Sequence, residues 1–153
     1  HVEFSLSSGL TDYRDTYQVV VIAGMGAHTM IDILTKDLHH AKHAKRMILQ
    51  PNKHVDTLRK FLSDASFKIE HEILLEEKGK FYEILQVSFS PSKVVYTELD
   101  IVFGPILRKE RNPSFQKKYK SILEKKVKQM LAISDQREKE KLIHEIQRIK
   151  EVL

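Results

Sequence analysis

The chain has 153 residues, 41% of them hydrophobic, and a formal net charge of +5 at pH 7. This size and composition suit one ordinary domain, or a small domain with an appendage, and exclude a disordered chain. The absence of cysteine excludes disulfides, thiolate metal sites and cysteine nucleophiles, and no apolar run approaches the roughly 18 residues of a membrane span. We therefore expect a soluble protein of a reducing compartment, the cytoplasm.

Hydrophobic periodicity predicts an α/β unit, then two antiparallel strands, then a helical tail. The expected elements in chain order are a strand over 2–6, a buried strand over 18–23, a helix over 27–38, a parallel strand over 46–49, a helix over 55–65, a hairpin of strands over 67–75 and 81–89, and helices starting near residues 97, 112 and 135. The sheet is therefore expected to be mixed, parallel first and antiparallel at its end.

Two of these strands carry patterns that predict how they are buried. The continuous Val-Val-Val-Ile of residues 19–22 leaves no polar face, which is typical of a strand covered on both sides. Over 67–75 the apolar residues alternate with charged ones, so Phe67, Ile69, Ile73 and Leu75 are expected, with His71, to share one face.

Capping patterns predict where the helices of the tail begin. Thr97 with Asp100 makes a capping pair, Asn112 before Pro113 is a strong start, and Asp135 caps the last helix. An apolar seam steps by four, three and four residues in that helix; its members are Leu142, Ile146, Ile149 and Leu153. The tail is therefore expected to be an antiparallel coiled-coil hairpin.

Positive charge is concentrated in this tail. Residues 1–90 carry 11 basic and 12 acidic side chains, whereas residues 91–153 carry 15 and 9. Such a concentration attracts polyanions, of which nucleic acid is the commonest in the cytosol, although a solvated helix face has the same composition. The candidate RNA-binding residues are Arg108, Lys109, Arg111, Lys117, Lys118, Lys125 and Lys128.

Two unusual turns follow the two parallel strands. The first strand runs into residues 24–27, with the sequence Gly-Met-Gly-Ala, and the second runs into residues 50–52, Gln-Pro-Asn. Because ligands of open α/β sheets bind beyond the carboxyl ends of parallel strands, we expect both turns to line one site. Taken alone, the first could equally be a tight turn between strand and helix, and the second a helix start capped by Asn52.

Several motifs resemble a known family. They are, in order, Val20 to Gly26, Leu49 to Asn52, Leu58-Arg59 with Phe61-Leu62, Lys80 to Ile84, Glu98-Leu99, and Phe103 to Pro105. As an ordered set over essentially the whole chain, they resemble the bacterial tRNA (adenine-22-N1)-methyltransferases known as TrmK. The resemblance implies an α/β, Rossmann-like class I methyltransferase domain over 1–91, followed by a helical coiled-coil domain over 92–153 that helps to hold tRNA.

The resemblance also implies methylation of N1 of an adenine in tRNA, with S-adenosylmethionine as the cofactor. Adenine N1 already carries a lone pair, so positioning is the main task, and the base must be unpaired or flipped out. The candidate catalytic residues are Gly24, Met25, Gly26, Gln50, Asn52 and Tyr82. The candidate cofactor-binding residues are Ser8, Gly9, Ala23 and Gly24.

The chain departs from the family pattern in three places. It begins at His1, without the glycine-rich loop and the acidic strand end that hold the cofactor in such enzymes. We expect two βα units, about 60 residues, to be missing, and this chain alone to be inactive without them. Ser8 stands where the family has Asp or Asn, and Ala27 where it has glycine, which is tolerated unless the turn needs a positive φ.

Three interpretations stay open at this stage: an RNA methyltransferase, a nucleic-acid-binding module without chemistry, and a coiled-coil oligomerisation protein. We expect tRNA as the partner, a monomer, no membrane and no metal. His39 and His43 lie four residues apart, with Asp37 near them, and could suggest a metal site. Such a site also needs further groups that orient its ligands by hydrogen bonds. Tyr82 alternates with buried positions and fits a core residue as well as a catalytic one, and His28 follows the glycine turn.

Overall fold

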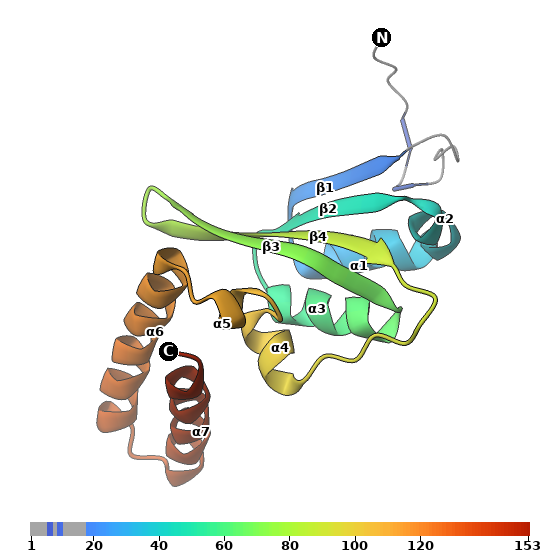
Figure 1. The fold of residues 1–153 in the computed structure, drawn as a ribbon. Helices are drawn as coiled ribbons and strands as arrows, with labels where there is room; N and C mark the ends of the chain where they lie inside the picture. Colours follow the sequence, from blue (N-terminus) through green and yellow to red (C-terminus); the bar gives the residue numbers. More distant parts are fainter. Residues whose placement is uncertain (1–5, 8, 11–17) are drawn as a thin grey trace.

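The computed structural model describes residues 6–7, 9–10 and 18–153 (Figure 1). The strand predicted over 2–6, apart from Leu6, and the candidate Ser8 lie outside these residues. The elements in order are β1 (Val19–Met25), α1 (Ala27–Lys36), α2 (Leu38–His43), β2 (Arg46–Pro51), α3 (Val55–Asp64), β3 (Phe67–Glu77), β4 (Lys80–Phe89), α4 (Glu98–Phe103), α5 (Leu107–Glu110), α6 (Pro113–Ala132) and α7 (Gln136–Val152). The elements follow the predicted types and order with two differences: the helix expected over 27–38 is divided at Asp37 and continues to His43, and the short helix α5 was not predicted.

The four strands form one sheet in the order β1-β2-β4-β3. β1 and β2 are parallel, and β4 runs antiparallel to both β2 and β3. Ile22 lies opposite Leu49, which in turn lies opposite Leu85, so β4 is tied directly to the central parallel pair. The predicted mixed sheet is confirmed.

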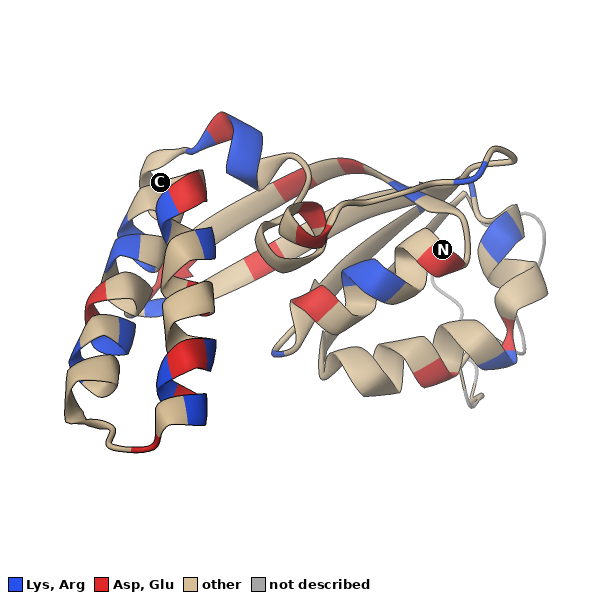
Figure 2. Cartoon of the chain, turned by 90° about the horizontal axis from the view of Figure 1, so that it is seen from below, with Lys and Arg blue, Asp and Glu red and all other residues tan. Residues whose placement is uncertain are grey.

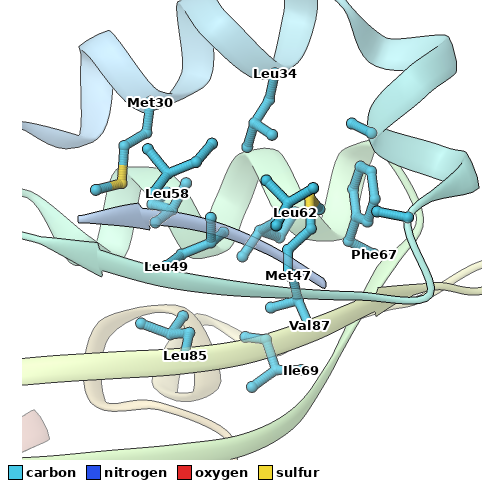
Figure 3. Packing of buried hydrophobic residues seen from close by; sticks show 14 of the residues in the cluster. Met30, Leu34, Met47, Leu49, Leu58, Leu62, Phe67, Ile69, Leu85 and Val87 are labelled. Carbon is cyan, nitrogen blue, oxygen red and sulfur yellow. The ribbon is translucent and has the colours of Figure 1, made fainter. Parts of the chain in front are cut away.

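The main core lies between one face of this sheet and helices α1 and α3 (Figure 3). Met30 and Leu34 of α1 and Leu58 of α3 are fully buried against Met47 and Leu49 of β2. Burying a side chain of this size stabilises the fold by about 1.5–3 kcal/mol. The layer therefore fixes β2, whose end carries one of the two unusual turns.

The prediction that β1 is covered on both faces is wrong. Val20 and Ile22 are buried in the core, but Val19 is 50% and Val21 65% exposed. Helices α1 and α3 lie on a single face of the sheet, and among the described residues β1 has only β2 as a strand neighbour. An apolar run shows that a strand tolerates burial on both faces, whereas the actual burial depends on what packs there.

The predicted alternation along β3 is correct only as far as Ile69. The pairing with β4 is irregular between Ile69 and His71, so one extra residue lies in β3. A β-bulge of this kind moves every later side chain to the other face. Consequently Glu72 and Leu74 are buried, and Ile73 is 55% exposed.

The helical part begins at the predicted caps. The Thr97 side chain accepts from the amide of Asp100, and the Asp100 carboxylate accepts in return from Thr97. Asn112 accepts from the amide of Phe115, and Asp135 caps α7 in the same way. Helices α6 and α7 run antiparallel, side by side, and α6 also packs on β3 (Figure 1).

A buried cluster of charges joins this helical part to the sheet. The guanidinium of Arg59 is fully buried and donates to Glu72 of β3, at 2.8 Å, and to Glu83 of β4. Glu83 also pairs with Lys118 of α6. Glu72 accepts from the backbone amide of Ile106, at 2.9 Å, just before α5. Charges from α3, β3, β4 and α6 thus meet in one place.

These ion pairs decide the protonation of Glu83. Burial would raise the pKa of its carboxyl group, but the neighbouring cations of Arg59 and Lys118 outweigh burial and lower the pKa below its ordinary value. For Arg59, burial acts to lower the pKa, and the two carboxylates reverse this effect and raise it. Glu83 and Arg59 are therefore ionised at neutral pH. No side-chain nitrogen or oxygen buried among the described residues lacks a hydrogen-bond partner.

Candidate functional site

The two turns predicted from the sequence lie against each other at the carboxyl ends of β1 and β2. Ala23 is paired with Gln50 and Met25 with Pro51, with an irregularity between the two pairs. The amide of Gly24 donates to Oε1 of Gln50 at 3.1 Å. Two parallel strands therefore deliver their turns to one edge, as the sequence predicts.

The side chain of Gln50 organises this corner. Its Nε2 donates to the carbonyl oxygen of Pro51 at 3.1 Å and to Oδ1 of Asn52 at 3.3 Å. The amide of Asn52 donates to the carbonyl oxygen of Met25 at 2.8 Å, which closes the corner from the other side. Both amide groups of the predicted pair are thus oriented, and the Asn52 side chain stays exposed.

The backbone of the corner is open toward solvent. Gly24 has φ +77°, which disfavours any residue with a side chain, and no atom lies within 4 Å of the place where a Cβ would be. Ala23 and Gly24 are exposed. Ala27 is buried at the first position of α1, where the backbone does not have a positive φ, so an alanine is accommodated there without strain.

Tyr82 lies in the neighbouring strand, on β4. It is half-buried and opposite Leu75 of β3, three residues beyond the last pairing of β4 with β2, at Leu85. Strand alternation puts Tyr82 on the face of the sheet opposite to Glu83 and Leu85. Gln50 lies on the same face as Tyr82. The ring is therefore near the same edge of the sheet without belonging to the main core.

Gly9 lies elsewhere. Its φ is +109°, and a Cβ there would lie 3.2 Å from the Asp37 carboxylate and 3.3 Å from Ile33. The next amide, of Leu10, donates to Asp37 at 2.9 Å. Asp37 follows the last turn of α1, whereas Gly24 precedes its first, and a ten-residue helix is about 15 Å long. The structure does not bring Gly9 and Gly24 together.

The predicted RNA-binding residues fall into two groups. Some are engaged within the chain: Lys118 with buried Glu83, Lys117 with Glu76 at 2.6 Å, Arg108 with Asp100 at 2.5 Å, and Arg111 with the carbonyl oxygens of Arg108 and Glu151. The others are exposed and have no acidic partner among the described residues; they are Lys109, Lys125 and Lys128. Basic residues predominate along α6, whose one acidic residue is Glu124, whereas basic and acidic residues alternate along α7 (Figure 2).

Three further side chains lie beside the corner: His28, which follows the glycine turn, and Lys53 and His54, which the sequence did not single out. The rings of His28 and His54 lie 5.5 Å apart, edge to face. Lys53 places its Cε 3.6 Å from where a Cβ on Gly26 would be, and its carbonyl oxygen accepts from the amide of Ala27 at 3.3 Å. Lys53 and His54 could have been found from the sequence, because they directly follow Gln50-Pro51-Asn52.

The sequence also contained no sign that Arg59 is a buried structural residue, since nothing in the pattern of a helix distinguishes a buried arginine from a solvated one.

The His39 and His43 rings are 4.2 Å apart, but Nδ1 of His43 forms a hydrogen bond with the carbonyl oxygen of His39. Within residues 6–7, 9–10 and 18–153, no group of three or more His, Asp or Glu side chains could hold a metal ion. No helix in the same ranges is long and apolar enough to cross a membrane.

Comparison with known proteins identifies one family. The family profile "TrmK: tRNA (adenine(22)-N(1))-methyltransferase" matches residues 1–151. A Bacillus subtilis protein named tRNA (adenine(22)-N(1))-methyltransferase is 34% identical over 104 residues, which are 65% of this chain and 44% of that protein. The chain spans about half the length of the curated relatives that it matches.

Solved structures share the fold. A crystal structure from Streptococcus pneumoniae superposes with a TM-score of 0.90 at 39% identity, covering 97% of this chain and 68% of the other. A second crystal structure of the same protein, in complex with S-adenosyl-L-methionine, gives a TM-score of 0.85 at 40% identity, with 97% and 67% covered. A Streptococcus agalactiae protein of the NADB-Rossmann superfamily gives 0.87 at 35% identity, with 97% and 66% covered. The described sheet and helices thus have a Rossmann-like methyltransferase fold.

Proposed function

Because this chain belongs to the TrmK family of tRNA (adenine(22)-N(1))-methyltransferases, we propose that the protein transfers a methyl group from S-adenosylmethionine to N1 of an adenine in tRNA. The observation that carries the proposal is the hydrogen bond from the amide of Gly24 to Gln50, which joins the two turns at the ligand edge of the sheet. A site that only positions its reactants needs this kind of fixed backbone and amide geometry.

The residues present fit the methyl-bearing end of the cofactor. Gly24 leaves open space where a side chain would otherwise stand, and Ala23 beside it is exposed. When bound, S-adenosylmethionine supplies the methyl group on its sulfonium centre. The role of Gly9 in cofactor binding stays a prediction, because Gly9 lies at the other end of α1.

The protein's own groups orient the acceptor. Asn52 presents an exposed amide, with acceptor and donor atoms suited to the edge of a base, and Gln50 holds it in place. Met25 and Gly26 let the backbone approach the adenine closely, and Tyr82 offers a ring face on the neighbouring strand. Methylation leaves positive charge on the adenine, so carbonyl dipoles at the corner stabilise the transition state.

The helical part serves as the RNA clamp in this proposal. We assign residues 1–91 to the methyltransferase domain and 92–153 to a coiled-coil hairpin whose exposed Lys109, Lys125 and Lys128 contact phosphates. Ile146 and Ile149 of the predicted seam are buried within the chain. Leu142 and Leu153 are partly buried, so most of the seam is covered within the chain, which supports a monomer. We propose that this monomer acts on tRNA in the cytoplasm.

The proposal is tested on the complete protein, with any segment that precedes this chain, by incubating it with S-adenosylmethionine and unmodified tRNA and mapping N1-methyladenine by mass spectrometry of nuclease digests. Gln50→Ala is the informative variant. It frees Gly24 and Asn52 at once, and a displacement near 1 Å costs about 100-fold in rate. Gln86→Ala on the same sheet face, away from the turns, is the control and retains the rate. Absence of N1-methyladenine with the unaltered protein contradicts the proposed activity.

A further inference from the structure

Three basic side chains gather beside the corner that carries Gly24. His28 is the second residue of α1, and Lys53 and His54 lie in the connection between β2 and α3. The two imidazole rings are 5.5 Å apart, and the stem of Lys53 lies over Gly26, with Cε 3.6 Å from where its Cβ would be. All three side chains are exposed. One ammonium group and two imidazoles therefore form a single patch at the rim of the site.

These side chains have no structural task that would explain the patch. Among the described residues none of the three forms an ion pair or a side-chain hydrogen bond to an acidic group. His54 stands at the cap of α3 in the left-handed region, with φ 58° and ψ 44°, yet its side chain does not cap the helix.

The local charge is unusual for this part of the chain. Residues 1–90 carry 12 acidic and 11 basic side chains, and the nearest acidic residues along the two helices are Asp32 and Asp56. Donors without acceptors at the rim of a site suit an anionic ligand. In an RNA the phosphate of a nucleotide lies one ribose away from its base, and Asn52 and His54 are two residues apart, within about 7 Å along the chain.

We propose that His28, Lys53 and His54 bind a backbone phosphate of the RNA next to the adenine held at the corner. The proposal rests on the proposed function and locates part of its substrate contact. Phosphate contacts set the position of a nucleic acid without selecting its sequence. The patch thereby fixes the nucleotide by its backbone, while Asn52 faces the edge of its base. It acts separately from the lysines of the hairpin.

The test compares two triple variants that remove the same residue types. Lys53→Ala with His28→Ala and His54→Asn removes the patch; asparagine is chosen because it tolerates the left-handed conformation. Lys45→Ala with His39→Ala and His43→Asn is the matched control. Its imidazoles also form a close pair, at 4.2 Å, but they lie on α2 before the start of β2, at the opposite edge of the sheet.

Affinity for labelled tRNA is measured by fluorescence anisotropy over a KCl series at pH 7. The patch variant loses about tenfold in affinity, the size of one charged hydrogen-bonded contact. The slope of log affinity against log salt falls by about 0.7, the value for one phosphate of a single strand. Lys53→Arg retains the slope, and the control variant matches the unaltered protein in both quantities.

An unchanged slope in the patch variant overturns the proposal, as does an equal loss in the control variant. Lys53→Ala alone, at an exposed position, gives the same answer if the triple variant is less stable. The methylation assay keeps the two proposals separable. If the unaltered protein methylates adenine N1 while the patch variant keeps its salt slope, the phosphate site is wrong and the proposed function stands.

Discussion

Replacing Arg59 by methionine removes the centre of the buried charge cluster while keeping a long side chain of similar reach. Arg59 is fully buried and pairs with two carboxylates, those of Glu72 and Glu83, which are also buried. After the replacement Glu83 keeps Lys118, but Glu72 keeps only backbone amides such as that of Ile106. A buried carboxylate that has lost its cation is destabilising, and removing one partner of such a pair costs about 3–5 kcal/mol.

This loss is a large share of the 5–15 kcal/mol by which most domains are stable. With an m value of about 2 kcal/mol per molar urea, the unfolding midpoint falls by about 1.5–2.5 M. Lys60→Met is the matched control on the same helix, because its ion pair with Asp64 is 66% and 64% exposed. An exposed pair of this kind contributes less than about 0.5 kcal/mol.

Equilibrium urea unfolding followed by circular dichroism measures both variants. The carboxylates explain the loss only if neutralising them restores stability, so Arg59→Met combined with Glu72→Gln and Glu83→Gln is expected to recover part of it. A change below about 1 kcal/mol in Arg59→Met, or no recovery in the triple variant, refutes the account of the cluster as a mutually dependent charge set.

Three further outcomes follow from the same contacts. The folded-state pKa of Glu83 lies below its ordinary value of 4.5, because the neighbouring cations favour the ionised form. Its contribution to stability is therefore complete above about pH 5 and is lost as the pH falls through the folded pKa. Glu83→Gln is expected to flatten this loss of stability at acid pH in urea titrations between about pH 3 and 7. Gly104→Ala lowers the melting temperature by the equivalent of about 1–3 kcal/mol, because φ is +89° and the new Cβ would lie 2.6 Å from Glu72, whereas Ala at a permissive site would not. Lys125→Ala with Lys128→Ala reduces the salt slope of tRNA binding by up to about 0.9 per contacted phosphate and leaves the unfolding midpoint unchanged; an unaltered slope removes these lysines from the RNA interface.

The predictions from sequence succeeded where the determining contacts are local. Thr97 and Asp100 lie three residues apart, and the reciprocal hydrogen bonds that such a spacing permits are present. The two turns met as predicted for a different reason, since parallel neighbouring strands must place their carboxyl ends at one edge. Spacing and topology alone sufficed, without knowledge of any side-chain packing.

The failures concern partners that are far apart in the sequence. Arg59 is separated from Glu72 by 13 residues and from Glu83 by 24, and no periodicity connects them. The bulge after Ile69 depends on the register that β4 imposes, so the alternation read from β3 alone placed Ile73 in the core and Glu72 outside. The exposed Val21 shows the same limit, because strand composition does not reveal which layers cover a sheet.

The bulge has a consequence for the site. By turning Glu72 inward it creates the carboxylate that binds Arg59 and the start of α5, where the amide of Ile106 donates to it. Glu83, on the adjacent strand, holds α6 through Lys118, and β4 is hydrogen-bonded to β2, the strand that ends at Gln50. The hairpin is thus connected to the corner through a short series of buried, directional contacts. If an RNA is held by the hairpin and reacts at the corner, weakening this connection should impair transfer to tRNA more than it impairs cofactor binding, because only the tRNA spans both ends.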